Sequence, residues 1–279
     1  MITNVKKIAF TLVLCFSIQL VCSQESKYGT LSFNKAVNIS GKQRMLTQKM
    51  GKIYLYLLSN PNDFKAKKNL KITKIIFEKQ NLILEKNSSS ALTKSKLKEV
   101  KDTWDKYKKF LASKPNKDDA IKIINTNSTL LKYTNNVVNS IVRESKSRTN
   151  TLDTDLHEEQ QELKDIINKS GRQRMLSQRL ALYYFANKPK LKNNNTSAKL
   201  ERVFVELDNA LNDLLVSSFN NERIDNALGE VMERWEAIKS NKDRFLKQGY
   251  NDSEVYKLSD ELTRKFNKIT NLYEKVKIE

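Results

Sequence analysis

Two arginines of this chain lie in nearly the same local sequence, and their chemistry suits the binding of an anion. Arg44 lies within Asn-Ile-Ser-Gly-Lys-Gln-Arg-Met-Leu-Thr-Gln-Lys-Met (38–50), and Arg174 within Asn-Lys-Ser-Gly-Arg-Gln-Arg-Met-Leu-Ser-Gln-Arg-Leu (168–180). At an offset of 130, eight of the thirteen positions are identical, so the chain is a tandem repeat. A guanidinium offers five N–H donors in a fixed plane, which match a planar oxyanion or a carboxylate.

The spacing around each arginine predicts a helix with two adjacent faces. Leucine, methionine and isoleucine recur at spacings of three and four from Leu46 to Leu57, which predicts a stripe toward a bundle core. The neighbouring face carries glycine, arginine and glutamine at spacings of three and four in both copies. A glycine inside a helix costs about 1 kcal/mol relative to alanine, so Gly41 and Gly171 indicate close approach of a backbone or a small ligand. The candidate ligand-binding residues are Asn38, Gly41, Arg44, Gln48, Asn168, Gly171, Arg174 and Gln178.

A structural interpretation competes with ligand binding at each of these residues. The two arginines could tie their helices to a neighbouring carboxylate or helix end. The glutamines of the motif favour hydrogen bonds between helices, and Asn38 and Asn168 could bond either backbone or ligand. Methionine and tryptophan in a helical protein are typical of the core. The residues interpreted in this way are Gln43, Gln48, Gln173, Gln178, Met45, Met175, Trp104 and Trp235.

Catalytic and metal chemistry find no support in the residue types. His157 is the only histidine and lies in a polar, acidic stretch, so we expect neither a metal site nor a catalytic base, and no cofactor. The net charge of +19 favours polyanions or anionic membranes in general. However, the lysines scatter around their helices and no nucleic-acid-binding module accompanies them, so we expect no nucleic-acid partner.

The amino terminus has the pattern of a secretory signal. Lys6 and Lys7 precede an apolar run over residues 8–21, and residues with small or medium-sized side chains occupy positions 21–23, where a signal peptidase would cleave. We predict a signal peptide over residues 1–23 and a mature protein that is periplasmic or secreted. A lipoprotein site at Cys22 and an uncleaved anchor are the alternatives. Both cysteines lie in this segment, so the mature chain would contain no disulfide.

The rest of the chain predicts an all-α protein. Three prolines and six glycines in 279 residues leave long uninterrupted runs, which suit helices. Turn signals divide each copy into four helices, giving two tandem four-helix up-and-down bundles over residues 24–150 and 151–279. The apolar residues that we expect to face inward in the second and fourth helices are Leu70, Ile72, Ile75, Ile76, Leu82, Ile83, Ile121, Ile124, Leu131, Val138 and Ile141 in copy one, and Leu200, Val203, Phe204, Leu207, Leu211, Leu214, Leu215, Val255, Leu258, Leu262, Ile269 and Leu272 in copy two.

The arrangement of the two copies depends on the connection between them. Neither proline nor glycine occurs between Pro115 and Gly171, so a long shared helix is expected to stack the bundles end to end as a rod. The polar stretch 145–155 leaves a second possibility. If the chain bends there, the two motif helices would lie side by side.

Both copies of the motif resemble the periplasmic sensory domains of type IV pilus chemotaxis transducers (PilJ) and nitrate/nitrite sensor kinases (NarX-like). The resemblance is to the Asn-x-Ser/Ala-Gly-x-x-Arg-Met motif on the first helix of a four-helix bundle. In the nitrate sensors this arginine, with backbone beside the glycine, holds the anion between two subunits. The resemblance therefore implies this role for Arg44 with Gly41 and for Arg174 with Gly171. The middle of the motif, Lys42-Gln43 and Arg172-Gln173, is closer to the pilus-transducer version.

These observations together predict an exported, non-catalytic sensory module. It would bind a small anion such as nitrate, nitrite or a carboxylate, and it would pass a signal by docking on a membrane-bound receptor or on a second copy. The alternative is a structural or adaptor protein, in which the motif faces only mediate helix packing or dimerisation.

Overall fold

The computed structural model describes residues 27–148, 154–189, 191 and 194–277, and the predicted signal peptide lies outside them. The predicted all-α class is confirmed. A short hairpin of β1 (Lys27–Tyr28) and β2 (Leu31–Ser32) precedes the helices. The helices of copy one are α2 (Phe33–Ser59), α3 (Phe64–Asn87), α4 (Ala91–Phe110) and α5 (Lys117–Arg148). Those of copy two are α6 (Thr154–Ala186), α7 (Asn194–Leu215), α8 (Glu222–Lys239), α9 (Lys242–Leu246) and α10 (Asp252–Tyr273).

Several helices begin at a polar side chain that caps the free N–H groups of the first turn. Asp63 accepts a hydrogen bond from the backbone of Ala66 at the start of α3, and Ser90 does the same for α4. At α10, Asn251 and Glu254 form a reciprocal capping box. These caps fix the turns close to where the sequence predicts them, whereas the β1–β2 hairpin and the short α9 were not expected.

The two bundles repeat each other in their cores. In copy one the ring of Phe77 packs on Trp104 with 4.7 Å between centroids, and in copy two Phe204 packs on Trp235 at the same distance. Each indole also donates a hydrogen bond to an acid one helix away, at 3.0 Å and 2.8 Å respectively. Both tryptophans are buried, as predicted for core anchors. The repeat therefore extends from the motif to the packing of the third helices.

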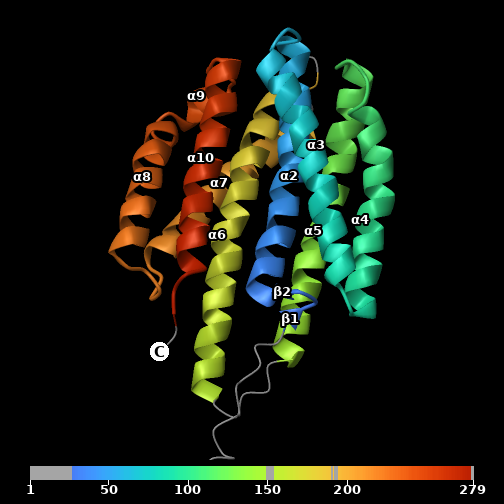
Figure 1. Cartoon of the computed structure of the whole chain (residues 1–279). Helices are drawn as coiled ribbons and strands as arrows, with labels where there is room; N and C mark the ends of the chain where they lie inside the picture. Colours follow the sequence, from blue (N-terminus) through green and yellow to red (C-terminus); the bar gives the residue numbers. More distant parts are fainter. Residues whose placement is uncertain (1–26, 149–153, 190, 192–193, 278–279) are drawn as a thin grey trace, which may run out of the picture.

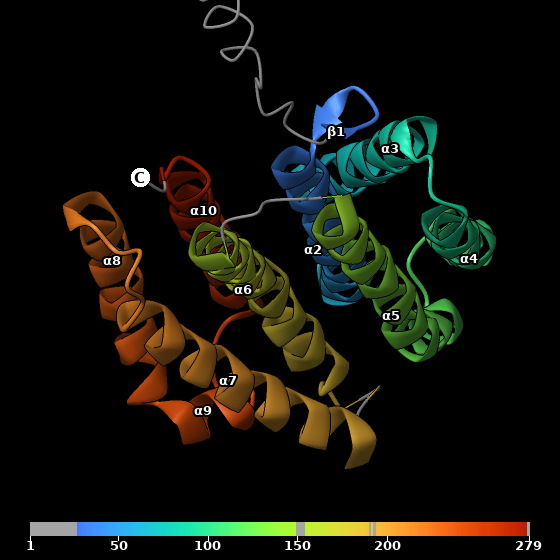
Figure 2. The ribbon, with the colours of Figure 1, turned by 90° about the horizontal axis from the view of Figure 1, so that it is seen from below.

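The predicted end-to-end rod is wrong. The motif helices α2 and α6 lie side by side along most of their length. The remaining helices of each copy lie on either side of this central pair (Figure 1). The view from below shows the same pairing, with α3, α4 and α5 on one side and α7, α8 and α10 on the other (Figure 2). The physical reason is that α2 is buried nearly all round from Gln43 to Leu57, and a helix without a solvated face needs neighbours on every side.

Some apolar residues that were predicted to face inward are exposed. On α3 the exposed residues are Ile72, Ile75, Ile76, Leu82 and Ile83, with relative exposures of 39–49%. Ile121 and Leu215 are also exposed, at 41% and 38%. On α3 a second stripe fits the 3.6-residue period equally well, and its members Ala66, Leu70, Thr73, Phe77 and Leu84 are the ones that reach the core.

Candidate functional site

Each motif arginine donates a hydrogen bond to the motif asparagine of the other copy. Arg44 on α2 donates to the side-chain oxygen of Asn168 on α6 at 2.8 Å, and Arg174 on α6 donates to that of Asn38 on α2 at 3.0 Å. The side-by-side helices therefore bring together six of the eight candidate residues. We call this group, Asn38, Gly41, Arg44, Asn168, Gly171 and Arg174, the motif site.

Each arginine also donates a hydrogen bond to a second asparagine, on the fourth helix of its own copy. Arg44 also donates to Asn135 on α5 at 2.9 Å, and Arg174 donates to Asn267 on α10 at 2.9 Å. Arg174 Nε further donates to the carbonyl of Gly171. The side-chain acceptors of both guanidiniums are thus neutral amides.

Neither guanidinium has a carboxylate within ion-pair distance among the described residues, although both are almost fully buried. Arg44 is 3% exposed and Arg174 is 1% exposed, and the Nε of Arg44 is buried without a hydrogen-bond acceptor. Burial, and then the charge of Arg174, lowers the pKa of Arg44 to about 9. Burial lowers the pKa of Arg174 to about 10, opposed by the more distant Glu274. Both therefore remain cationic at neutral pH, and no carboxylate forms an ion pair with either of them, although the charge of Glu274 acts on Arg174 from beyond ion-pair distance.

The glycines make room for these arginines. A β-carbon at Gly41 would lie 3.5 Å from Arg44 Nη2 and 3.6 Å from Arg174 Nη2. A β-carbon at Gly171 would lie only 2.9 Å from Arg174 Nη2. A close approach is therefore present at Gly171, where the approaching group is the guanidinium and not the predicted backbone or ligand, whereas a β-carbon at Gly41 would make only ordinary van der Waals contacts.

Two of the four motif glutamines form the predicted hydrogen bonds between helices, and the other two do not. Gln43 donates to the backbone of Phe77 on α3, and Gln178 donates to three acceptors on α10, so these two connect helices as predicted. Gln48 and Gln173 bond only within their own helices, to Thr47 and to the backbone of Lys169. Neither Gln48 nor Gln178 bonds a guanidinium, and the side-chain oxygens of all four glutamines are buried without a donor.

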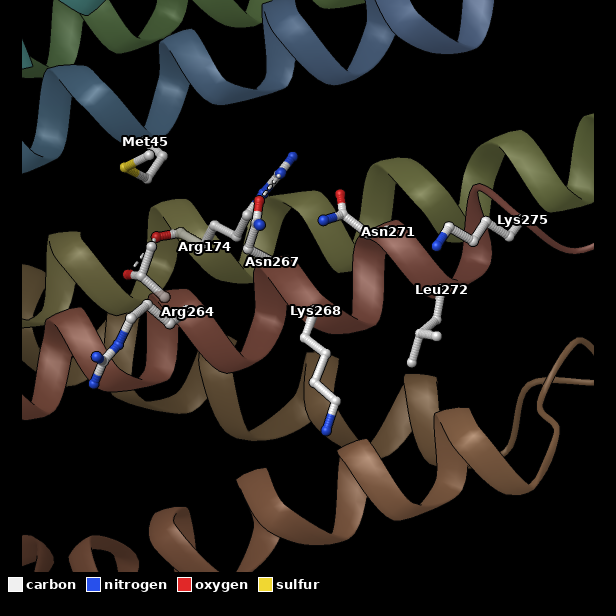
Figure 3. A pocket seen from close by; sticks show the side chains of 9 residues that line it. Met45, Arg174, Arg264, Asn267, Lys268, Asn271, Leu272 and Lys275 are labelled. Atoms are coloured by element: carbon white, nitrogen blue, oxygen red, sulfur yellow. Dashed lines mark hydrogen bonds between the residues drawn. The ribbon is translucent and has the colours of Figure 1, made fainter.

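A cleft opens beside each arginine. The Arg174 cleft has a volume of about 540 Å³ and lies between Met45 of α2 and residues of α10 (Figure 3). It is lined by Met45, Arg174, Thr263, Arg264, Asn267, Lys268, Asn271, Leu272 and Lys275. The Arg44 cleft, of about 560 Å³, is lined by residues of α2, α5, α6 and α7 that include Arg44, Asn135, Asn139, Asn168 and Met175. The clefts are counterparts, because Met175, Asn135 and Asn139 repeat Met45, Asn267 and Asn271 in the other copy.

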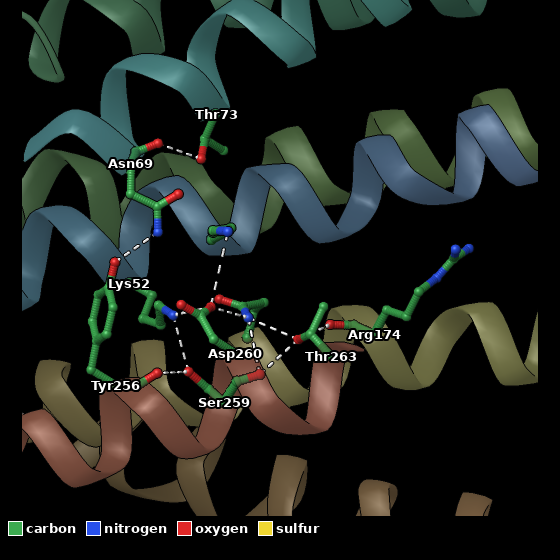
Figure 4. A network of polar contacts seen from close by, with 10 residues as sticks. Lys52, Asn69, Thr73, Arg174, Tyr256, Ser259, Asp260 and Thr263 are labelled. Atoms are coloured by element: carbon green, nitrogen blue, oxygen red, sulfur yellow. Dashed lines mark hydrogen bonds and ion pairs between the residues drawn. The ribbon is translucent and has the colours of Figure 1, made fainter. Parts of the chain in front are cut away.

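A buried ion pair joins the copies about two turns of α2 beyond Arg44. Lys52 on α2 is fully buried, and its Nζ lies 2.8 Å from Asp260 Oδ1 and 3.0 Å from Ser259 Oγ on α10 (Figure 4). It also lies 4.0 Å from the centre of the Tyr256 ring. Burial lowers the pKa of Lys52 to about 8, against the opposing charge of Asp260. The same carboxylate accepts from Gln178, which links the ion pair to the motif helix α6.

Sequence reasoning missed the two asparagines of the fourth helices and the buried ion pair. Asn135 and Asn267 repeat at an offset of 132, which is a usable signal, but they lie outside the motif in helices considered only for their apolar positions. Lys52 has no charged counterpart, because Leu182 occupies its place in copy two. Its partner Asp260 lies 208 residues away, and nothing local in the sequence connects them.

The part of the chain that the structure describes also bears on metal binding and on membrane insertion. Within that part, no group of three or more histidine, cysteine, aspartate or glutamate residues could hold a metal ion. No helix there is both long and apolar enough to cross a membrane.

Comparison with known proteins identifies one family. A family model described as "Type IV pili methyl-accepting chemotaxis transducer N-term" (PilJ) matches residues 30–129 and 156–260, one segment in each copy. No curated protein matches the chain, and no solved structure does.

Proposed function

Because the chain belongs to the PilJ family of chemotaxis-transducer amino-terminal domains, in two tandem copies, we propose that it is a sensory module that binds a small anion at the motif site. The family implies a sensory role and is typically non-catalytic. The identity of the anion, the route of export and the signalling partner belong to the proposal. The family match confirms the resemblance that the motif predicts.

One observation carries the proposal: two buried guanidiniums lie together with only neutral acceptors. Burying a charged group without a counter-charge costs several kcal/mol, which hydrogen bonds to amides offset only in part. An anion between Arg44 and Arg174 would supply the missing charge and could accept from Arg44 Nε, which has no acceptor. A planar oxyanion or a carboxylate fits the planar donor array of arginine.

Binding requires an asparagine oxygen to yield its place to the anion. Asn38 and Asn168 each hold the arginine of the other copy, so their displacement would change the contact between α2 and α6. Arg44 and Arg174 would then bond the ligand instead of the opposite helix. This exchange gives the module a means of converting ligand binding into a shift of one bundle against the other.

The test is a thermal-shift panel of nitrate, nitrite, sulfate, phosphate, acetate and succinate at constant ionic strength, with chloride as the reference. An anion at one hundred times its dissociation constant stabilises the folded state by about 2.7 kcal/mol. For a chain of this size that free energy raises Tm by about 5–10 °C. We expect Arg44→Met and Arg174→Met each to abolish the response.

Arg234→Met is the matched control, because Arg234 is an exposed arginine on α8 that pairs with Glu261 and lines neither the Arg174 cleft nor the Arg44 cleft. It should respond to the anion as the wild type does. The proposal is wrong if no anion of the panel raises Tm above chloride, or if the double variant Arg44→Met/Arg174→Met retains the response.

A structural role is the second candidate, and the exchange of partners between Arg44 and Asn168 and between Arg174 and Asn38 favours it. In that case the motif only holds the two bundles together. Loss of stability in Arg174→Met, combined with no response to any anion, would support this role over sensing.

We further propose export through a signal peptide over residues 1–23, and signalling through a membrane-bound receptor or a second copy. Cell fractionation combined with intact-mass measurement tests the first part. A periplasmic or secreted protein that lacks residues 1–23 is expected. A full-length cytoplasmic protein would contradict it, and a lipidated protein starting at Cys22 would favour the lipoprotein alternative.

A further inference from the structure

We propose that the Arg44 cleft is a separate recognition site for a small molecule that carries two or more anionic groups, such as an oligophosphate or a polycarboxylate. This site shares Arg44 with the motif site and rests in that respect on the proposed function. Its other groups, its size and its charge differ from what a single small anion requires.

The size of the cleft exceeds that of a simple oxyanion. Its volume is about 560 Å³, whereas one water molecule occupies about 30 Å³ in the liquid and a nitrate or acetate ion takes the place of only a few waters. A cleft of this size is in the range of pockets that hold organic ligands. An anion bound at Arg44 alone would leave most of the cleft to solvent.

The charge of the cleft is strongly positive and is contributed by four helices. Its bases are Arg44 of α2, Lys132 of α5, Arg172 and Arg179 of α6, and Lys199 and Arg202 of α7. The only acid among the lining residues is Glu206, which is 3.1 Å from Arg172 and neutralises that one arginine.

Arg44, Arg172 and Arg179 have hydrogen-bond partners, and the other three of these six bases remain available to a ligand. Among the described residues, Lys132, Lys199 and Arg202 form no ion pair, and Arg179 and Lys199 both lie near the ring of Tyr183, at 5.3 Å and 5.7 Å from its centre. Cations that repel one another across a cleft are stabilised by an anion between them. These bases lie on three different helices, α5, α6 and α7. A ligand therefore needs more than one charged group to contact them and Arg44 at the same time.

Comparison with the other cleft shows that this charge is specific to one copy. The Arg174 cleft has four bases, of which Lys268 is already bonded to Glu230, and α3 contributes none of its lining. When α3 and α7 are aligned on Phe77 and Phe204, the positions of Lys199 and Arg202 are occupied by Ile72 and Ile75. The two clefts thus share their asparagines but differ in the helix that would contact the outer part of a ligand.

The experiment is isothermal titration calorimetry of the full chain with pyrophosphate and with citrate, at about 0.15 M ionic strength, where distant surface charges are largely screened. We expect one of the two probes to bind with a stoichiometry of one. Lys132→Gln/Arg202→Gln should weaken this binding at least tenfold. The control Lys65→Gln/Lys71→Gln removes the same charge from exposed positions of α3 and should change it less than twofold.

The outcomes separate this inference from the proposed function. Lys132→Gln/Arg202→Gln leaves Arg44 and Arg174 intact, so its thermal-shift response to the small-anion panel should equal that of the wild type. If no small anion is sensed but a probe binds and is lost in this variant, the Arg44 cleft stands without the motif site. The inference is overturned if neither probe binds, or if the variant and its control weaken binding equally.

Discussion

Replacing Asp260 by asparagine should destabilise the protein strongly, because it leaves a buried lysine without its counter-charge. Lys52 is fully buried, whereas the side chain of Asp260 is 29% exposed. Removing one partner of a buried ion pair typically costs about 3–5 kcal/mol. Since water reaches Asp260, we expect the lower end for Asp260→Asn, about 3 kcal/mol, which corresponds to a Tm lower by about 6–12 °C.

A double-mutant cycle isolates the interaction between these two groups. Methionine fills the apolar space of the Lys52 side chain without a charge, so Lys52→Met should change the free energy of unfolding by less than about 1 kcal/mol. In that background Asp260→Asn should cost less than about 1 kcal/mol. The coupling energy should therefore be about 2–3 kcal/mol, which is within the range measured for residues in contact.

Urea unfolding at pH 7, followed by far-UV circular dichroism, measures all four proteins of the cycle. Arg234 and Glu261 lie 3.0 Å apart, and this pair provides the control on the same helix, because its cation is 45% exposed whereas Lys52 is fully buried. Glu261→Gln should cost no more than about 1 kcal/mol, as exposed ion pairs do. The reasoning is refuted if Asp260→Asn unfolds within 1 kcal/mol of the wild type, or loses as much stability with methionine at position 52 as with lysine.

Three further predictions follow from single residues. The pKa of Lys52 is lowered to about 8, so between pH 8 and its ordinary value the unfolded state binds more protons than the folded state. Stability should therefore rise with pH, by about 2 kcal/mol from pH 7.5 to 9.5 relative to Lys52→Met in urea titrations. A β-carbon at Gly51 would lie 2.7 Å from Leu182 Cδ1, so Gly51→Ala should cost about 1–3 kcal/mol, whereas Gly229→Ala, with nothing within 4 Å, should stabilise by about 0.5–1 kcal/mol in the same assay. Gly171→Ala displaces the end of Arg174 and should reduce the thermal-shift response to anion far more than it reduces Tm in buffer, and an unchanged response would contradict the proposed role of that arginine.

The fold was largely predictable because its helices end at prolines and capping residues and because the chain repeats itself. The pairing of the two copies was not, since a stretch without proline or glycine is compatible with both a straight helix and a bend. What decides is that α2 from Gln43 onward and α6 from Gln173 onward are buried on nearly every side, a property of the assembled packing. For the same reason the inward-facing residues of α3 were predicted wrongly in part. Two apolar stripes of α3 have helical spacing, and only the neighbouring helices determine which stripe is buried.

The candidate site was predictable in its residues but not in its geometry. The repeated glycine and arginine identify the place, and the structure brings six of the eight candidates together. That the arginines reach asparagines of the opposite copy depends on the side-by-side arrangement, which the sequence left open. The pairing of Lys52 with Asp260 has no counterpart in the other copy and so could not be inferred from the repeat.

The reciprocal bonds between Arg44 and Asn168 and between Arg174 and Asn38 join two halves of one chain, so dilution of the protein should not separate them. A site shared by separate chains disappears when those chains dissociate, but here Arg148 and Thr154 are separated by only five residues of the same chain. A tether this short keeps the effective concentration of one half around the other in the millimolar range. If the motif site binds an anion as proposed, its occupancy should depend on the concentration of the anion and not on that of the protein. A mutation can also change one arginine of the pair and leave the other unchanged.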